Sequence, residues 1–387
     1  MKKFLAILLA LSMVFALVAC ATTETATTEE ATTEETTEEA ATVEEEAAEE
    51  EAVVEEEATT TTLKLASHNA VVEGNPYRVR YELDIQEAAE AAADYGFDIS
   101  YSSFVSNWDA ATEAQQLQNS INEGYDIILV NPVATTGLDP IIEAAQEAGI
   151  TYINCDCAYM STDVDVLNVL TDQEYLGYTT ACYAGEVLGE GAKVVMIAAL
   201  DGNQANTDRQ RGFEKGIEEY GLEVVATANH DWDTTKAQQA MAEILNSGVE
   251  FDGVLISQCA ENALAAFDAA GVDYPEFIGF GDTGAYMQKM LEINSDEIVT
   301  HYMVLSNPPG VGATGLNFAL NLISGKTLKD GVYAEGAEDT HQIWIPSQVC
   351  YTDQDQDEYV DFANSYESGD SITFWLTIDE VAEQYFN

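Results

Sequence analysis

Positive charge is scarce in this sequence. Only 13 of its 387 residues are lysine or arginine, against 70 aspartates and glutamates, and the formal net charge is −57. A protein that binds DNA or RNA needs a basic surface that displaces the counterions of the phosphates, and this composition excludes one. Attachment to anionic lipid through a cluster of basic residues is disfavoured for the same reason.

Histidine and cysteine are also rare. The four histidines lack metal-binding spacings such as HExxH. Of six cysteines, Cys20 ends an apolar run, which leaves five, an odd number that does not describe a full disulfide framework. There is no GxSxG nucleophile motif and no Walker A run. We therefore expect no enzyme activity, no cofactor and no metal.

Two patterns imitate a cofactor or metal site. Residues 279–284 read GFGDTG, which fits the dinucleotide fingerprint GxGxxG, but they fall in the last α/β unit of a lobe and not in the first. Residues 353–361 carry alternating aspartates like a calcium loop, yet Glu358 and Asn364 stand where Gly and Glu are required. We expect a turn at the first and a solvated acidic turn at the second.

The N-terminus has the composition of an export signal. Lys2 and Lys3 precede an apolar run over residues 4–18, which is followed by Ala19 and Cys20. The last four residues, LVAC, resemble the lipobox of bacterial lipoproteins. This resemblance implies cleavage after residues 1–19 and lipid attachment at Cys20. The alternative is an uncleaved membrane anchor, because about 18 apolar residues can just span a bilayer.

Residues 20–62 are predicted to form a disordered, acidic tether. After Cys20 they contain only Ala, Thr, Glu and Val, with 16 Glu and 14 Thr. Such a segment buries too little apolar surface to offset the entropy of ordering, and its like charges repel one another. Setting aside these glutamates and the two leader lysines leaves 54 acidic and 11 basic residues in 63–387. Acid therefore pervades the folded part as well.

From residue 63 onward, short apolar runs alternate with amphipathic segments. Strands are expected at 63–66, 97–101, 126–130, 150–155, 193–198, 223–228, 253–257 and 277–280, and helices at 79–95, 112–123, 138–148, 174–188, 207–220, 234–247 and 261–270. Continuous apolar strands separated by helices indicate parallel sheets covered on both faces. Two rounds of this pattern predict two α/β lobes. A ligand of such sheets lies outside the carboxyl ends of the strands.

Several landmarks occur in a characteristic order. They are Asn75-Pro76-Tyr77, the run 124–132 (GYDIILVNP), Asn154-Cys155-Asp156, residues 209–213 (RQRGF) and Ile278-Gly279-Phe280. Over roughly residues 63–335 the chain resembles the sugar-binding, type I periplasmic substrate-binding proteins of ABC transporters. The resemblance implies two Rossmann-like lobes with parallel sheets, joined by three hinge strands. The first lobe would comprise 63–170 and 304–333, and the second 171–303 and 334–387.

The same resemblance implies site residues. The family's carboxylate that holds two sugar hydroxyls corresponds to Asp156. The family's guanidinium from the second lobe corresponds to Arg209, which could instead be a charged surface residue. An amide and a stacking aromatic correspond to Asn75 and Tyr77, although Tyr77 could equally pack in the core. Gln258 lies beside a position that often carries an amide or carboxylate.

Three further candidates are less direct. Asp172 marks the crossing between the lobes, and Asp282 comes one position after the family's usual Asp, where Gly281 stands. Trp108 could stack on a sugar or cover its lobe. The ribose-binding pattern has an Arg where this chain has Cys157, and a second aromatic where it has Arg78. The sequence therefore supports a general sugar site, suited to another simple sugar, a polyol or a furanose-like signal molecule.

The expected function is that of a monomeric solute receptor at the outer face of the bacterial cell membrane, anchored only through its lipid. It would capture a sugar or polyol and dock on an ABC transporter permease. The alternative is the ligand-binding input of a sensing system without transport. A hydrolase is disfavoured by the missing nucleophile–base motif. A repressor of the same fold is disfavoured because the N-terminus carries no DNA-binding module.

Overall fold

The computed structural model describes residues 60–387 apart from residues 74, 346 and 348–349. The predicted signal peptide, Cys20 and the tether as far as residue 59 lie outside the described residues. Thr61 and Thr62, which the sequence analysis assigns to the tether, belong instead to the first strand, because their backbone pairs with Phe97 and Asp98 whatever their side chains. None of the described helices is both long and apolar enough to cross a bilayer.

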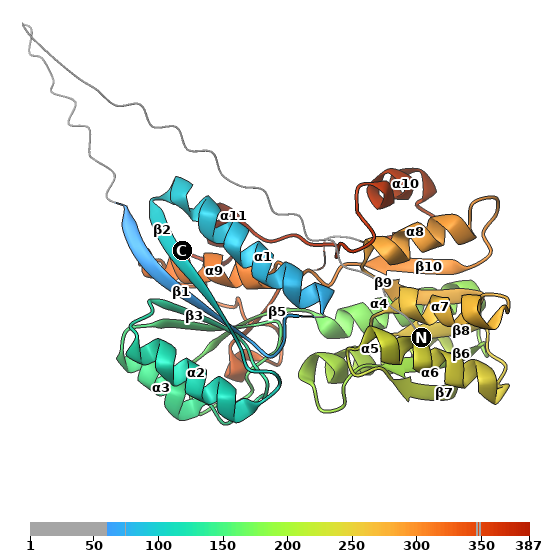
Figure 1. The fold of residues 1–387 in the computed structure, drawn as a ribbon, viewed down its shortest axis with the longest axis horizontal. Helices are drawn as coiled ribbons and strands as arrows, with labels where there is room; N and C mark the ends of the chain where they lie inside the picture. Colours follow the sequence, from blue (N-terminus) through green and yellow to red (C-terminus); the bar gives the residue numbers. More distant parts are fainter. Residues whose placement is uncertain (1–59, 74, 346, 348–349) are drawn as a thin grey trace, which may run out of the picture. The chain divides into compact units, whose positions relative to one another are not determined.

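The first sheet contains six parallel strands in the order β11-β5-β4-β3-β1-β2. Figure 1 labels β1, β2, β3 and β5 of this sheet. Its strands are β1 (Thr61–Asn69), β2 (Phe97–Val105), β3 (Ile127–Asn131), β4 (Thr151–Cys155), β5 (Leu167–Thr171) and β11 (Gln342–Ile345). The helices on one face are α1 (Pro76–Ala91), α9 (Val311–Ile323) and α11 (Ile378–Tyr385), and those on the other are α2 (Ala110–Asn122) and α3 (Asp139–Glu147). Every residue of β3 is buried, as expected for a strand covered on both faces.

The second sheet has the order β12-β10-β9-β8-β6-β7, and only β12 is antiparallel to its neighbour. Its strands are β6 (Lys193–Ala198), β7 (Glu223–Asn229), β8 (Gly253–Ile256), β9 (Phe277–Gly281), β10 (His301–Leu305) and β12 (Cys350–Thr352). The helices on one face are α4 (Gln173–Leu188) and α5 (Gln204–Tyr220), and those on the other are α6 (Thr234–Ser247), α7 (Ala260–Ala270), α8 (Gly284–Ile293) and α10 (Gln356–Asn364). Two 3₁₀ turns, η1 (Ala92–Tyr95) and η2 (Glu338–Thr340), complete the elements.

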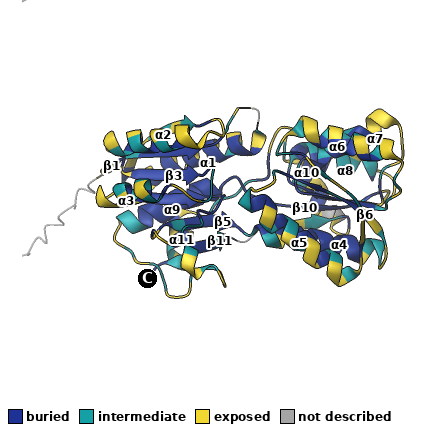
Figure 2. Cartoon of the chain, turned by 90° about the horizontal axis from the view of Figure 1, so that it is seen from below, coloured by how far each residue is buried: buried dark blue, intermediate teal, exposed yellow. Residues whose placement is uncertain are grey.

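The predicted class, two α/β lobes built on parallel sheets, is confirmed. In both lobes the helices turn their buried side toward a sheet and their exposed side toward solvent (Figure 2). Three connections lead from one sheet to the other, from β5 to α4, from β10 to α9 and from β11 to β12. These three match the expected hinge strands in number, and the tail makes a further crossing that was not expected.

The C-terminal tail differs from the expectation. All of 334–387 is expected in the second lobe, but β11 pairs with β5 and α11 packs on α9, both in the first lobe. Only β12 and α10 join the second lobe. The reason is that β11 continues the first sheet beyond its edge strand β5. Residues 371–377 then cross between the lobes, which adds a fourth connection.

Candidate functional site

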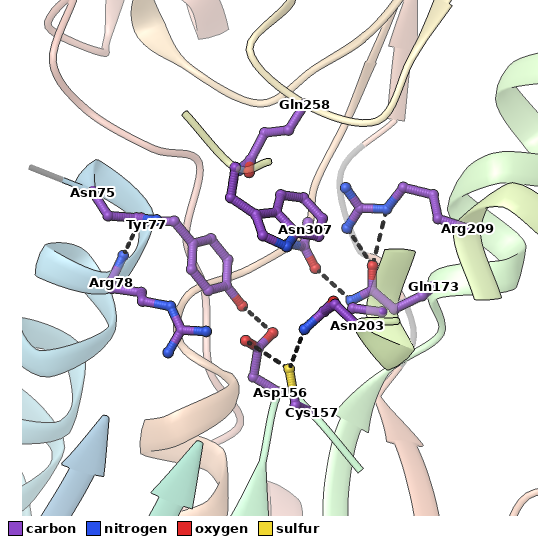
Figure 3. Close-up of a pocket in the computed structure, with 12 residues that line it drawn as sticks. Asn75, Tyr77, Arg78, Asp156, Cys157, Gln173, Asn203, Arg209, Gln258 and Asn307 are labelled. Carbon is purple, nitrogen blue, oxygen red and sulfur yellow. Dashed lines mark hydrogen bonds between the residues drawn. The ribbon is translucent and has the colours of Figure 1, made fainter. Parts of the chain in front are cut away.

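A cavity lies at the carboxyl ends of the strands and is lined from both lobes (Figure 3). Part of the cavity is open to solvent. Five of the eight predicted ligand residues line this central cavity: Asn75, Tyr77, Asp156, Arg209 and Gln258. The location is the one that open parallel sheets favour.

Asp156 is held in place by the first lobe. It follows β4 directly and has a φ of 69°, the left-handed conformation that ends the strand. Its Oδ1 accepts a hydrogen bond from the Tyr77 hydroxyl at 2.8 Å, and its Oδ2 accepts one from Asn131 Nδ2 at 2.7 Å. Each carboxylate oxygen has two lone pairs, so the group retains acceptor capacity for ligand hydroxyls. Hydrogen bonds to an ionised acceptor are the strong ones.

Arg209 reaches the central cavity from the second lobe. It lies on α5, is 1% exposed, and donates from Nε to Gln173 Oε1 at 3.1 Å and from Nη1 to the carbonyl of Ser257. Gln173 in turn donates to Asn307 Oδ1 at 3.0 Å, so a chain of neutral amides orients the guanidinium. Burial lowers the pKa of Arg209 to about 10, although nearby carboxylates raise it, and the group is charged at neutral pH.

The rings of Phe280 and Trp232 flank this guanidinium. Its central carbon lies 5.0 Å from the Phe280 ring centroid and 5.3 Å from that of Trp232. Both distances permit a cation–π interaction, which partly replaces the lost hydration of the buried charge.

Trp108 does not line the central cavity. Its ring is 39% exposed, and the guanidinium carbon of Arg78 lies 5.2 Å from the ring centroid. Arg78 is 6% exposed and does line the cavity. The sequence leaves two roles open for Trp108, stacking on a sugar and covering its lobe. The contact with Arg78 is neither of these, because the Trp108 ring packs against a buried arginine that stands where the family has a second aromatic.

Asp172 and Asp282 also lie off the wall of the central cavity. Asp172 caps α4 by accepting a hydrogen bond from the backbone N–H of Tyr175 at 2.9 Å, and it lines two neighbouring cavities instead. Asp282 is 2% exposed. Burial raises the pKa of Asp282 to about 7, with Glu261 adding to the effect and Arg209 opposing it.

Seven further residues line the central cavity beyond those predicted from the sequence: Arg78, Cys157, Gln173, Asn203, Ala205, Trp232 and Asn307. Asn203 caps α5, and its Nδ2 lies 3.7 Å from the Cys157 sulfur of the other lobe. A sequence signal existed for five of the seven, because Cys157, Gln173, Asn203, Trp232 and Asn307 each follow a strand within a few residues. The same rule selects Asp156 and Gln258.

The chemistry of the central cavity suits a hydroxylated solute. A carboxylate, two guanidinium groups and several amides can donate to or accept from hydroxyls, and the rings can cover an apolar sugar face. Burial, and then Asp156, raise the pKa of the Cys157 thiol to about 12, so it is not a thiolate nucleophile. Residues 60–387, with the gaps stated above, contain no cluster of three His, Cys, Asp or Glu that could hold a metal.

The GxGxxG pattern at 279–284 and the acidic turn at 353–361 have structural roles. A Cβ on Gly281 would lie 2.1 Å from the Tyr286 ring, and one on Gly284 would lie 1.9 Å from the carbonyl oxygen of Glu367 in the tail. Close packing therefore accounts for these two glycines of the GxGxxG pattern. In the acidic turn, Asp353 accepts a hydrogen bond from the Tyr183 hydroxyl at 2.7 Å. All five cysteines of the described residues are unpaired.

The buried carboxyls predict how stability depends on pH. Burial raises the pKa of Asp282 and Glu113 to about 7 and that of Asp84 to about 6, above the values of 3.8 to 4.5 expected in the unfolded chain. The folded protein thus binds protons more tightly, and this stabilisation is complete below pH 4 and is lost as the pH rises through 7. We expect Tm to fall by several degrees between pH 5 and pH 8.

Thermal unfolding in 0.3 M NaCl, which screens the acidic surface, measures this. Asp282→Asn should flatten the profile, because the amide does not titrate. A Tm that rises from pH 5 to pH 8, or a variant whose profile is as steep as that of the parent, would contradict the assignment.

Comparison with known proteins agrees with the fold. The sequence profile of the periplasmic binding protein domain matches residues 71–327. The ribose import binding protein of Bacillus subtilis is 27% identical over 167 residues, 43% of this chain and 54% of that protein. The protein of the same description from Escherichia coli is 24% identical over 279 residues, 71% of this chain and 92% of that protein. The chain thus spans just over half of the first relative and most of the second.

A solved structure shows the same fold. The ABC transporter solute binding protein of Thermobispora bispora superposes with a TM-score of 0.69 at 22% identity, over 83% of this chain and 94% of that one. The profile match covers more than half of the sequence and includes nearly all the strands that end at the central cavity. The chain belongs to the periplasmic binding protein family.

Proposed function

We propose that this protein captures an uncharged simple sugar or polyol outside the membrane and delivers it to the permease of an ABC transporter. The observation that carries the proposal is the position of Asp156 and Arg209, which reach one cavity from two different lobes. A ligand bound by both would favour the closed arrangement of the lobes, because only that arrangement makes both sets of contacts. The ribose import role of the relatives supports the ligand class and the permease.

The proposal includes three finer points. The protein acts as a monomer, it binds its ligand without chemical conversion, and the lipid at Cys20 holds it at the outer face of the cell membrane. We propose a sugar other than ribose, because Cys157 stands where the ribose-binding pattern has an arginine, and its thiol cannot replace five N–H donors.

A thermal-shift panel of monosaccharides and polyols on residues 60–387, which include all of β1, tests the ligand class. A ligand at 1,000 times its Kd should stabilise the protein by about 4 kcal/mol, and its Tm should rise with ligand concentration. Nucleosides and amino acids serve as controls from other ligand classes. A shift with one of these, and none with any sugar or polyol, would refute the proposal.

A further inference from the structure

Each lobe presents one buried arginine to the central cavity. Arg78 lies in the first turn of α1, which follows β1, and Arg209 lies on α5, which follows β6. The two residues are 6% and 1% exposed, and both line the cavity, from opposite lobes (Figure 3). Because β1-α1-β2 and β6-α5-β7 are matching units of the two sheets, the arginines occupy equivalent places in the lobes.

A tryptophan packs against each of these guanidinium groups, and the two tryptophans lie in matching turns. After β2 the chain reads SNWD, and after β7 it reads HDWD. The tryptophan and the residue before it have positive φ angles in both turns, 62° and 53° at Trp108 and 59° and 51° at Trp232. The guanidinium carbons of Arg78 and Arg209 lie 5.2 and 5.3 Å from the respective ring centroids. Residues other than glycine rarely adopt this conformation, so its occurrence in both turns indicates that the turns serve to place the rings.

Neither guanidinium group is neutralised by a carboxylate. The ion pairs found in residues 60–387, with the gaps stated above, include neither arginine. An amide oxygen accepts from each instead, that of Asn69 from Arg78 and that of Gln173 from Arg209. The NH₂ group of each amide donates to a further side chain at 3.0 Å, which fixes the orientation of the amide. A neutral acceptor thus orients the guanidinium and leaves its charge available to another partner.

Arg78 retains most of its hydrogen-bonding capacity. A guanidinium group has five N–H donors. Arg209 donates to Gln173 from two nitrogens and to the carbonyl of Ser257 from the third. Within the part of the chain that the structure describes, the Arg78 side chain donates only to Asn69, and it borders the cavity. A buried charged donor costs free energy until it meets an acceptor, and a ligand oxygen can be that acceptor.

We propose that Arg78 binds the ligand directly and selects a sugar or polyol that presents two adjacent hydroxyls to the first lobe. The proposal rests on the proposed function and adds a donor to the first lobe, where Asp156 is the acceptor. The planar guanidinium fork fits two neighbouring oxygens, which a point charge such as an ammonium does not. Trp108 is a positioning residue, because its ring holds the guanidinium and does not line the cavity.

The competing role for Arg78 is to offset the buried carboxyl group of Glu113. Glu113 is 1% exposed, and its Oε1 accepts a hydrogen bond from the N–H of Val133 at 3.0 Å. Burial raises the pKa of Glu113 to about 7 even though Arg78 opposes the effect. Arg78 therefore leaves much of the cost of burying this carboxylate in place, which disfavours the competing role.

Calorimetric titration of residues 60–387 and of Arg78→Gln tests the proposal. The probes are ribose, allose, xylitol and myo-inositol, together with any other sugar or polyol of the panel that stabilises the parent. The affinity for the tightest probe should fall by about thirtyfold or more, because a hydrogen bond to a charged group is lost. Arg78→Lys keeps the charge without the fork and should lose about tenfold. Thermal unfolding without ligand establishes that each variant is folded, and Arg78→Lys provides the test if Arg78→Gln does not fold.

Lys193→Gln is the matched control, because Lys193 is exposed at the first position of β6, the end of the strand away from the cavity. It removes the same charge, and the affinity should stay within about twofold of the parent. If Arg78→Gln binds within threefold of the parent, Arg78 does not hold the ligand, and the proposed function stands. Failure of every sugar and polyol of the panel to bind the parent refutes the proposed function itself.

Deoxy derivatives of the tightest probe test the selectivity. Removing either hydroxyl that Arg78 holds should cost about tenfold in the parent and less than twofold in Arg78→Gln, and these two hydroxyls should be adjacent. Losses that are equal in parent and variant for every hydroxyl would show that Arg78 does not contact the ligand.

A double-mutant cycle tests the positioning role of Trp108. Trp108→Leu should lower the affinity by about threefold to tenfold, and Trp108→Phe should restore most of it, because a phenyl ring can still pack on the guanidinium. In the Arg78→Gln background, Trp108→Leu should cause no further loss. Losses that simply add would contradict the positioning role, since Trp108 would then act on the ligand independently of Arg78.

Discussion

Replacing Asp156 with alanine is expected to weaken binding of the captured sugar by at least about a hundredfold. Its carboxylate is positioned by Tyr77 and Asn131, and we propose that it accepts hydrogen bonds from two ligand hydroxyls. A hydrogen bond to a charged group contributes about 1.5–3 kcal/mol, so the loss of two exceeds the 2.7 kcal/mol that corresponds to a hundredfold change. Isothermal titration calorimetry with the tightest sugar of the panel measures the effect.

Asp163→Ala is the matched control for this substitution. Asp163 lies in the same segment after β4, is exposed, and lines neither the central cavity nor its neighbours. Its removal changes the net charge by the same amount, and the affinity should stay within about twofold of the parent. If Asp156→Ala binds the sugar within threefold of the parent, this carboxylate does not hold the ligand.

Gly212→Ala is expected to cost about 2–3 kcal/mol of stability and to disturb the site as well. Gly212 lies where α5 packs on α4, and a Cβ there would lie 2.1 Å from the carbonyl oxygen of Glu174 and 2.6 Å from the backbone N of Tyr178. Backbone atoms of a helix cannot yield locally, so the two helices must separate. Overpacking of this kind typically costs about 1–3 kcal/mol.

The same separation of α4 and α5 should also weaken sugar binding. Arg209 lies three residues before Gly212 on α5, and its Nε bonds to Gln173 on α4, so moving the helices apart pulls this pair apart. We expect a Tm lower by several degrees together with a loss of sugar affinity of tenfold or more. Chemical denaturation and calorimetry on the same preparation measure the two effects.

Gly369→Ala provides the comparison, because Gly369 is exposed and a Cβ there would meet no atom within 4 Å. Its stability should change by less than about 0.5 kcal/mol. A Gly212→Ala variant as stable as Gly369→Ala would show that α4 and α5 are not as closely packed as described.

Much of the fold could be predicted from hydrophobic patterning. The alternation of apolar runs and amphipathic segments gave β1 to β4 and β6 to β9, because strands covered on both faces are apolar throughout. The tail could not be assigned in this way. β11 and β12 have four and three residues, too few for a period to be recognised, and their partners β5 and β10 lie far away in the sequence. Only three-dimensional pairing decides which sheet each joins.

Some residues of the candidate site could be predicted from the sequence in the same way, and others could not. Asp156 and Gln258 were found because they follow strands that the pattern delimits, whereas Asn307 follows β10, which it does not. Asp172 and Gln173 are neighbours, and the sequence analysis selects the one that caps α4. Which of the two faces the central cavity depends on where the helix begins, and a helix boundary is uncertain by a residue or two from sequence.

The crossing tail has a consequence for how the chain is made. The first lobe needs β11 and α11, and the second needs β12 and α10, and all four lie between residue 342 and residue 385. Neither lobe can therefore close its core until residues 342–385 have been synthesised. Contacts between such distant segments also form slowly, since the loops they close are long. β11 and β12 are edge strands of the two sheets, so both lobes depend on the same short segment for completion.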